Sequence, residues 1–592
     1  MKNVFLLPLA VLLCVPSAFG QADLVGDWIH PAPGEDAMDK GPGPATGDFL
    51  GLPLNDAGVF RAEAFSDNWL TIPEHQCTPH PAPYEYWGPG GVTMTIHKEY
   101  EPIKRRLVAI HIDGTYGLDR TIWMDGRPHP PAEAMHTFTG FSTGHYDGDN
   151  LVVETTHMKL TWIKRNGTAL SDRARMIEYF MRHDNFFTYV EIVDDPVYLS
   201  QPFIRTSEWQ EIPRPALMLG RFGTLGDEPV FYKCFPVEEL SNDRYRVPHF
   251  MPGSNQLMKE FSDLNQVPMW ALRAGAETMY PEFMDQLKVG RPAGLPAEAV
   301  MADRAAEPTR EKEPDPVVHS FRVKDQVWLI SDGRSNTTIN VGDEGVMIVD
   351  TGREEMADAI MAEIRKIAGD KPVRYVANTS WYPDHTGGNA KLSEGTKVPV
   401  AQRAAIISHE NTLAKLSEIG KTGDHLPTDT FFGVSKQIRF NDEPIDVLYE
   451  PNAHTDGDVL VSFRKSDVLC VGDIINANRY PIIKTEEGGS INGEIDALNR
   501  ILDITVPDWR EEGGTNVIPG HGHIYNEADV ADYRDMLVII RERIQDAIKK
   551  GKTLEQVKAD RMTRDYDTYY GSTTGEWTTD MFVTAVFNSL KK

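Results

Sequence analysis

Cysteine is scarce in this chain of 592 residues, with only four in total. No two of them form a CxxC pair, which excludes a cysteine-based zinc site, and their number excludes a disulfide-rich scaffold. Cys77 and Cys234 could pair in an oxidising compartment. Cys470 lies in the apolar stretch "DVLCVGD" and is expected to be a core residue.

Positive charge is also in short supply, because the net charge is −28 and the pI is near 5.1. A phosphate backbone needs a basic surface, so we expect no nucleic acid partner. An anionic membrane surface is disfavoured for the same reason. The expected partner is a small-molecule substrate, and the oligomeric state is left open.

Beyond the first twenty residues, no apolar run is long enough to span a bilayer. Residues 1–20 have one lysine, an apolar centre and small residues before Gln21, which is typical of a secretory signal peptide. We therefore expect a soluble protein that is periplasmic or secreted after removal of this peptide.

The patterns along the chain predict an α+β multidomain protein. Residues 21–210 alternate apolar and polar residues between turn signals, which predicts a β-rich barrel or sandwich. A mixed extension (211–290) and a linker rich in proline, alanine and charge (291–317) follow. Strands and helices then mix over 318–545, and 546–592 is expected to be a helical tail of two helices around an aromatic loop.

The β-rich segment resembles a family of exported bacterial domains of unassigned function. The matching stretches are "EHQCTPH", "MDGRPHPP", "GFSTGHYDGDNLVVETTH" and "VEIVDDPVYLSQPF". Its histidines are spread over different strands and turns without short ligand spacing, so we expect structural or surface roles for them rather than a metal site. They are His75, His80, His97, His111, His129, His136, His145 and His157.

The segment 318–545 places histidines and carboxylates where its predicted strands end. Asp384 and His385 follow "VRYVANT", His454 lies in "AHTDGD", Asp473 ends "DVLCVGD", and His521 lies in "NVIPGHGH". Side chains at strand ends of an α/β sheet converge in space. Imidazoles with carboxylates and no thiolate suit zinc, and iron or manganese also fit.

These motifs occur in the order found in the metallo-β-lactamase fold, which the segment resembles. "VMIVDTG", "PDHTGGN", "AHTDGD", "GD" and "PGHG" carry the resemblance. It implies an αβ/βα sandwich and a hydrolase site. Asp384, His385 and His521 would form the second metal site of the family, Asp473 would be the carboxylate that often bridges two metals, and His454 would belong to the first site.

The chain departs from this pattern at two first-site positions, where Ser380 and Tyr382 replace histidines. A serine hydroxyl is a poor zinc ligand, and a phenol with an ordinary pKa of about 10 ionises only with strong help. We therefore expect one metal ion. Asp384, His454 and Tyr382 are the predicted catalytic residues. His454 would act as general base or hydrogen-bond to the substrate oxyanion, and Tyr382 would either donate a proton to the leaving group or only fill the vacated space.

The loop 476–498 is expected to face the substrate, with Tyr480 and Lys484 as its contacts. Three classes of function remain open. The first is an exported metal-dependent hydrolase of a small ester or lactone. The second is a degenerate domain of the same fold that binds a ligand without turnover, and the third is a redox or accessory protein.

Overall fold

The computed structural model describes the chain outside a few segments. The described residues are 23–30, 46–66, 68, 71–72, 76, 78–86, 93–114, 119–213, 244–283, 285, 317–394, 403–508 and 513–591. The predicted signal peptide, the linker 291–317 apart from residue 317, and the pair Cys77 and Cys234 lie outside these residues. Among the described helices, none combines the length and apolar character needed to cross a membrane.

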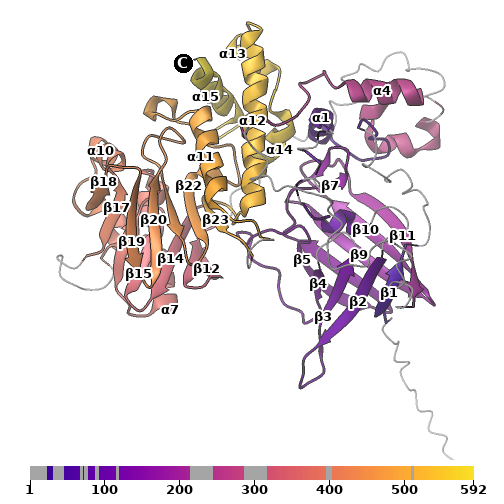
Figure 1. Cartoon of the computed structure of the whole chain (residues 1–592), viewed down its shortest axis with the longest axis horizontal. Coiled ribbons are helices and arrows are strands. Elements are labelled where there is room, and N and C mark those ends of the chain that lie inside the picture. Colours follow the sequence, from indigo (N-terminus) through magenta and orange to yellow (C-terminus); the bar gives the residue numbers. More distant parts are fainter. Residues whose placement is uncertain are drawn as a thin grey trace, which may run out of the picture.

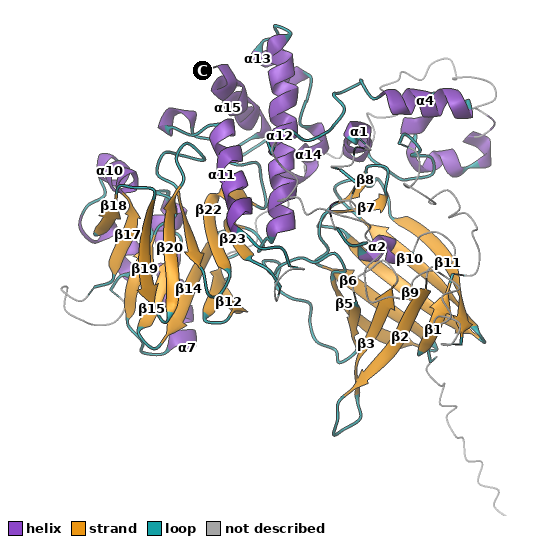
Figure 2. Cartoon of the chain, in the orientation of Figure 1, coloured by secondary structure: helices purple, strands orange, loops and turns teal. Residues whose placement is uncertain are grey.

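The N-terminal domain is a closed barrel, which confirms the predicted β-rich fold (Figures 1 and 2). Around the barrel the strands run in the order β1-β11-β10-β9-β6-β5-β4-β3-β2. All neighbours are antiparallel except β4 and β5. The strands are β1 (Gly26–Ile29), β2 (Thr93–Tyr100), β3 (Leu107–Gly114), β4 (Arg120–Trp123), β5 (Phe141–Asp147), β6 (Asn150–Thr156), β9 (Arg175–His183), β10 (Phe186–Asp194) and β11 (Phe203–Ile212).

Alternation along the strands fills the barrel with large side chains. In β10, every second residue from Phe187 to Val193 is buried. Trp28 packs edge-on against Phe187, and Trp209 stacks on the same ring. The buried Arg120 pairs with Glu178 among these aromatic side chains. The interior is therefore a packed core that encloses the Arg120–Glu178 pair.

Smaller elements cover one end of the barrel. They are the hairpin β7 (Thr161–Lys164) and β8 (Thr168–Leu170), and the helices α1 (Asp56–Ala64), α2 (Ala82–Glu85) and α4 (Gln256–Asn265). The described part of the extension also contains the 3₁₀ turns η4 (Ala271–Arg273) and η5 (Gly275–Met279).

The C-terminal domain contains two facing sheets. The 7-stranded sheet has the strands β12 (His319–Lys324), β13 (Val327–Ser331), β14 (Asn336–Gly342), β15 (Gly345–Val349), β16 (Val373–Ala377), β17 (Ala405–His409) and β18 (Asp429–Phe431). The 5-stranded sheet has β19 (Ser435–Phe440), β20 (Glu443–Tyr449), β21 (Val459–Phe463), β22 (Val468–Asn476) and β23 (Asn516–His521). One apolar cluster joins residues of both, among them Met347 and Val461.

Helices cover the outer faces of this sandwich, as the resemblance implied (Figure 2). Helix α7 (Ala357–Ala368) packs on the first sheet, while α11 (Ile491–Ile504) and α12 (Glu527–Lys549) pack on the second. The remaining helices are α8 (Pro383–Thr386), α9 (Asn389–Leu392), α10 (Glu410–Glu418), α13 (Leu554–Ala559), α14 (Arg564–Tyr570) and α15 (Thr579–Lys591), with 3₁₀ turns η6 (Glu354–Met356), η8 (Gly423–His425) and η9 (Thr485–Glu487).

The tail differs from its prediction, because its aromatic segment is helix α14 rather than a loop. Asp565 in this helix forms a fully buried ion pair with Arg543 of α12, and Tyr566 is buried in the same core. Helix α12 also runs through the expected domain boundary at residue 545. The tail is therefore part of the layer of helices that covers the second sheet.

The two domains are in direct contact. The buried Lys159 of the barrel domain pairs with Asp529 of α12 and donates to Asn526 Oδ1 at 2.9 Å. The guanidinium of Arg173 lies 4.1 Å from the centre of the Tyr569 ring of α14. These contacts join the barrel to the helices beside β23.

Candidate metal centre

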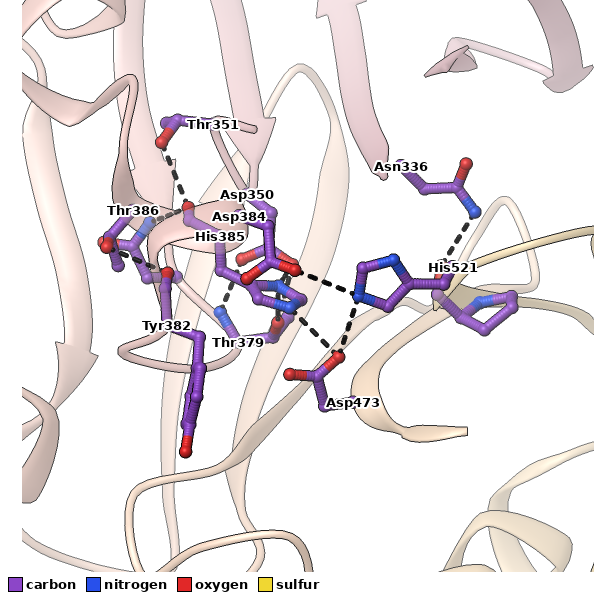
Figure 3. A network of polar contacts seen from close by, with 12 residues as sticks. Asn336, Asp350, Thr351, Thr379, Tyr382, Asp384, His385, Thr386, Asp473 and His521 are labelled. Atoms are coloured by element: carbon purple, nitrogen blue, oxygen red, sulfur yellow. Dashed lines mark hydrogen bonds and ion pairs between the residues drawn. The ribbon is translucent and has the colours of Figure 1, made fainter. Parts of the chain in front are cut away.

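Figure 3 shows that Asp384, His385, Asp473 and His521 point toward one another. Asp384 and His385 lie on the short helix α8, which follows β16. Asp473 lies within β22, and His521 is the last residue of β23. His454 lies in the loop between β20 and β21. Segments far apart in the sequence thus supply one site.

Three of these side chains satisfy the spacing of metal ligands. Atoms of Asp384, His385 and His521 that could bind an ion lie within 4.8 Å of one another. His521 Nε2 is 3.3 Å from Asp384 Oδ2 and 3.2 Å from Asp473 Oδ1. His385 Nε2 is also 3.2 Å from Asp473 Oδ1. The Asp473 carboxylate therefore lies between the two imidazoles.

Both imidazoles are oriented through their other nitrogen. His385 Nδ1 is 2.8 Å from Asp350 Oδ2, and His521 Nδ1 bonds the main-chain oxygen of Arg334. Such contacts on Nδ1 fix the tautomer and leave Nε2 as the ligand atom. His385 Nε2 is buried and makes no hydrogen bond to any described residue, despite its short distance to Asp473. An unpaired lone pair in this position fits a metal ion.

Asp350 is a further candidate residue of the site, which the sequence motifs alone do not indicate. Its φ is 59°, and its carboxylate accepts from the main-chain N–H of Thr379 at 2.8 Å and from the Thr379 hydroxyl at 2.6 Å. In the sequence, Asp350 is the acidic residue that directly follows the strand in "VMIVDTG". Its role depends on contact with His385, 35 residues away.

The ring of His385 packs closely against the main chain of β23 at Gly520. A Cβ atom on Gly520 would lie 2.8 Å from His385 Cε1, well inside contact distance. Glycine is therefore needed here for the ring to reach its place beside Asp473.

Opposite charges in the site stabilise one another. Although burial opposes it, Asp384 and Asp473 raise the pKa of His521 to about 9. Although burial again opposes the shift, the contact with His521 lowers the pKa of Asp384 to about 2. The pocket therefore stabilises positive charge beside its carboxylates. A divalent cation would supply this positive charge once the histidines release their protons.

The two first-site positions carry no metal-binding imidazole. Ser380 is fully buried, and its hydroxyl makes no hydrogen bond to the described residues. The Tyr382 ring lies 4.9 Å from the His454 ring, and its hydroxyl is 3.5 Å from Glu487 Oε2. Burial, and then the charge of Glu487, raises the pKa of Tyr382 above its usual range, so its phenol is neutral.

His454 lies beside the other ligands but makes different contacts. Its Nδ1 is 3.2 Å from Asp458 Oδ1 and 3.7 Å from Asp473 Oδ2. Its Nε2 is buried and makes no hydrogen bond to the described residues. Since Asp458 holds the ring by Nδ1, Nε2 is available either to a metal ion or to a proton.

The structure contradicts one of the two expected substrate contacts. Tyr480 is 1% exposed, stacks on Phe582 and donates to Asp567 Oδ1 at 3.0 Å, so it is a core residue and this prediction is wrong. Lys484 is half-buried, with its ammonium 5.5 Å from the centre of the Tyr382 ring. It lies close enough to the site to approach an anionic group.

Comparison with known proteins agrees with this architecture. The sequence profile of the metallo-beta-lactamase superfamily matches residues 330–521. The alpha subunit of 2,4-dinitroanisole O-demethylase from Nocardioides sp. (strain JS1661) is 25% identical over 166 residues, which are 27% of this chain and 47% of that protein. The chain thus spans about half the length of this curated relative.

Solved structures resemble the chain in part. The metallo-beta-lactamase from Pontibacter korlensis is 19% identical and has a TM-score of 0.31, covering 38% of this chain and 99% of its own. The sec-alkylsulfatase Pisa1 from Pseudomonas sp. is 14% identical and has a TM-score of 0.37. The match covers 46% of this chain and 50% of that one. The profile match, the two facing sheets with their outer helices and the cluster of candidate ligands agree, and the C-terminal domain of this chain has the metallo-β-lactamase fold, with residues 330–521 matching the superfamily profile.

Proposed function

We propose that this protein is an exported hydrolase that uses a single metal ion to cleave a small ester or lactone. The observation that carries the proposal is the convergence of Asp384, His385, His521 and Asp473, beside first-site positions that lack two imidazoles. Export rests on the leader-like residues 1–20.

Asp384, His385 and His521 would hold the ion, with Asp473 as fourth ligand. This donor set suits zinc, and iron or manganese are alternatives. When bound, the ion supplies Lewis-acid polarisation of the scissile group and a water of lowered pKa.

Side chains of the protein would accept and donate the protons of the reaction. His454 would accept a proton at Nε2, because Asp458 holds the ring through Nδ1 and no described residue occupies Nε2. The neutral phenol of Tyr382 would protonate the leaving oxygen. Lys484 would attract an anionic part of the substrate along the face of Tyr382.

Hydrolysis of p-nitrophenyl acetate tests this function. We expect turnover by the purified full-length protein and none above background for Asp384→Asn, because the amide cannot replace a carboxylate ligand. Asp343→Asn is the matched control, since that side chain is fully exposed, and it should keep wild-type turnover. Turnover that persists in Asp384→Asn would contradict the assignment.

The second candidate is ligand binding without turnover. The specific observation in its favour is the buried hydroxyl of Ser380, which has no hydrogen-bond partner in the described part of the chain and stands where the resemblance places a metal ligand. Binding of a small ester with no product formed across a broad substrate panel would select this function over hydrolysis.

A further inference from the structure

We infer that the barrel domain positions the metal ligand His521 through Glu133 and His136. These two residues lie in the connection between β4 and β5 and contact both segments that hold the His521 ring. The inference rests on the assignment of His521 as a ligand, and it gives the N-terminal domain a role in building the metal site of its neighbour.

The first contact is made by the buried carboxylate of Glu133. Its Oε2 is 2.8 Å from His319 Nε2, and its Oε1 accepts from the Ser331 hydroxyl at 3.3 Å. Its main-chain oxygen accepts from the N–H of Ile524 at 2.9 Å. One residue of the barrel domain thus joins β12, the end of β13 and the segment that follows β23.

The end of β13 leads into the turn that orients His521. Asp332 Oδ1 accepts from the N–H groups of Arg334 and Ser335 at 2.8 and 2.6 Å, which shapes the turn. The turn presents the main-chain oxygen of Arg334 to His521 Nδ1. Asn336 then donates to the main-chain oxygens of Pro519 and Gly522, at 3.0 and 2.8 Å, which ties the turn to β23 (Figure 3).

The second contact is made by His136. Its ring stacks on His523, two residues after His521, with ring centres 4.1 Å apart and planes 12° from parallel. His136 Nδ1 is 3.0 Å from the main-chain oxygen of Met158, which holds the ring in place. Burial lowers the pKa of His136 to about 4, so a neutral ring faces His523 at neutral pH.

His136, Asp172 and His523 also have ligand atoms within 4.8 Å of one another, which raises the question of a second metal site. The ring planes argue against it. Imidazole lone pairs lie in the plane of the ring, and two stacked rings with centres 4.1 Å apart and planes only 12° from parallel cannot direct their lone pairs to one ion. The cluster is therefore better explained as packing that holds the segment 521–525.

Outer partners of metal ligands are worth about 10–100-fold in metal affinity. The test is the affinity of the full-length protein for Co²⁺, together with the visible absorption of the Co²⁺ protein, which reports ligand geometry. Neither residue contacts His521 itself, so we expect Glu133→Gln and His136→Ala each to weaken Co²⁺ binding by about tenfold, the lower end of this range, and to alter the absorption. His136→Phe, which keeps an aromatic ring on His523, should retain more affinity than His136→Ala.

Arg173→Gln is the matched control, because the contacts between the domains that it removes are a hydrogen bond to the main-chain oxygen of Tyr569 and a ring contact with the same residue of α14. It should leave Co²⁺ affinity and absorption unchanged. Wild-type affinity and absorption in both Glu133→Gln and His136→Ala would overturn the inference, as would an equal loss in Arg173→Gln. Failure of the wild-type protein to bind Co²⁺ at all would instead count against the ligand assignment on which the inference rests.

Discussion

Replacing His385 with alanine is expected to abolish metal binding and hydrolysis together. The side chain is 1% exposed, and its Nε2 faces Asp473 with no hydrogen bond to a described residue, so nothing else in the pocket can replace this lone pair. Loss of the ring also leaves the Asp350 carboxylate without its 2.8 Å partner in a buried position. Elemental analysis of the purified variant should give under about a tenth of the wild-type metal content, because metal binding needs the full ligand set.

The matched control for this substitution is His183→Ala, which removes a histidine with a half-exposed side chain at the end of β9. Its metal content and hydrolysis should equal those of the wild type. Full metal content in His385→Ala would remove His385 from the ligand set, and the site would then need another assignment.

The second large effect is expected from His454→Gln, which should retain the metal and lose turnover by about 10²–10⁴-fold. The reason is that Asp458 holds His454 by Nδ1, while Asp384, His385, Asp473 and His521 form a ligand set without it. The measurements are metal content and the kcat for p-nitrophenyl acetate in the same preparation.

Asp458→Asn provides a graded control for His454. The substitution keeps the size of the side chain that contacts Nδ1 but holds the ring less firmly in place. Turnover should therefore fall less than in His454→Gln, and the metal should again be retained. If His454→Gln loses metal as completely as His385→Ala, then His454 is a ligand and not the proton acceptor.

Much of the candidate metal centre could be predicted from sequence, because its residues lie at or near strand ends in short motifs. Asp384, His385, Asp473 and His521 were named from strand ends, and the structure brings them together. The orienting role of Asp350 could not be predicted in the same way. It depends on a left-handed φ of 59° and on a contact 35 residues away, and neither leaves a local pattern.

Other predictions failed where burial is decided by distant segments. The residues around Tyr480 look like an exposed loop in sequence, but Phe582 and Asp567 of the tail cover this side chain. The aromatic segment of the tail forms α14 because Asp565 pairs with Arg543 of α12 and Tyr566 packs in the apolar core beside that helix. Similarly, no pattern in the barrel sequence indicates that His136 meets His523, since that contact requires both domains to be folded.

Titration of the metal-free full-length protein with Zn²⁺ tests the single-metal site most directly. Turnover of p-nitrophenyl acetate and bound zinc are followed together as metal is added to protein stripped by a chelator. The ligand geometry predicts that both rise in parallel and reach a plateau at one ion per chain. A plateau of activity that requires two ions per chain, or turnover that is complete before any zinc is added, would contradict it.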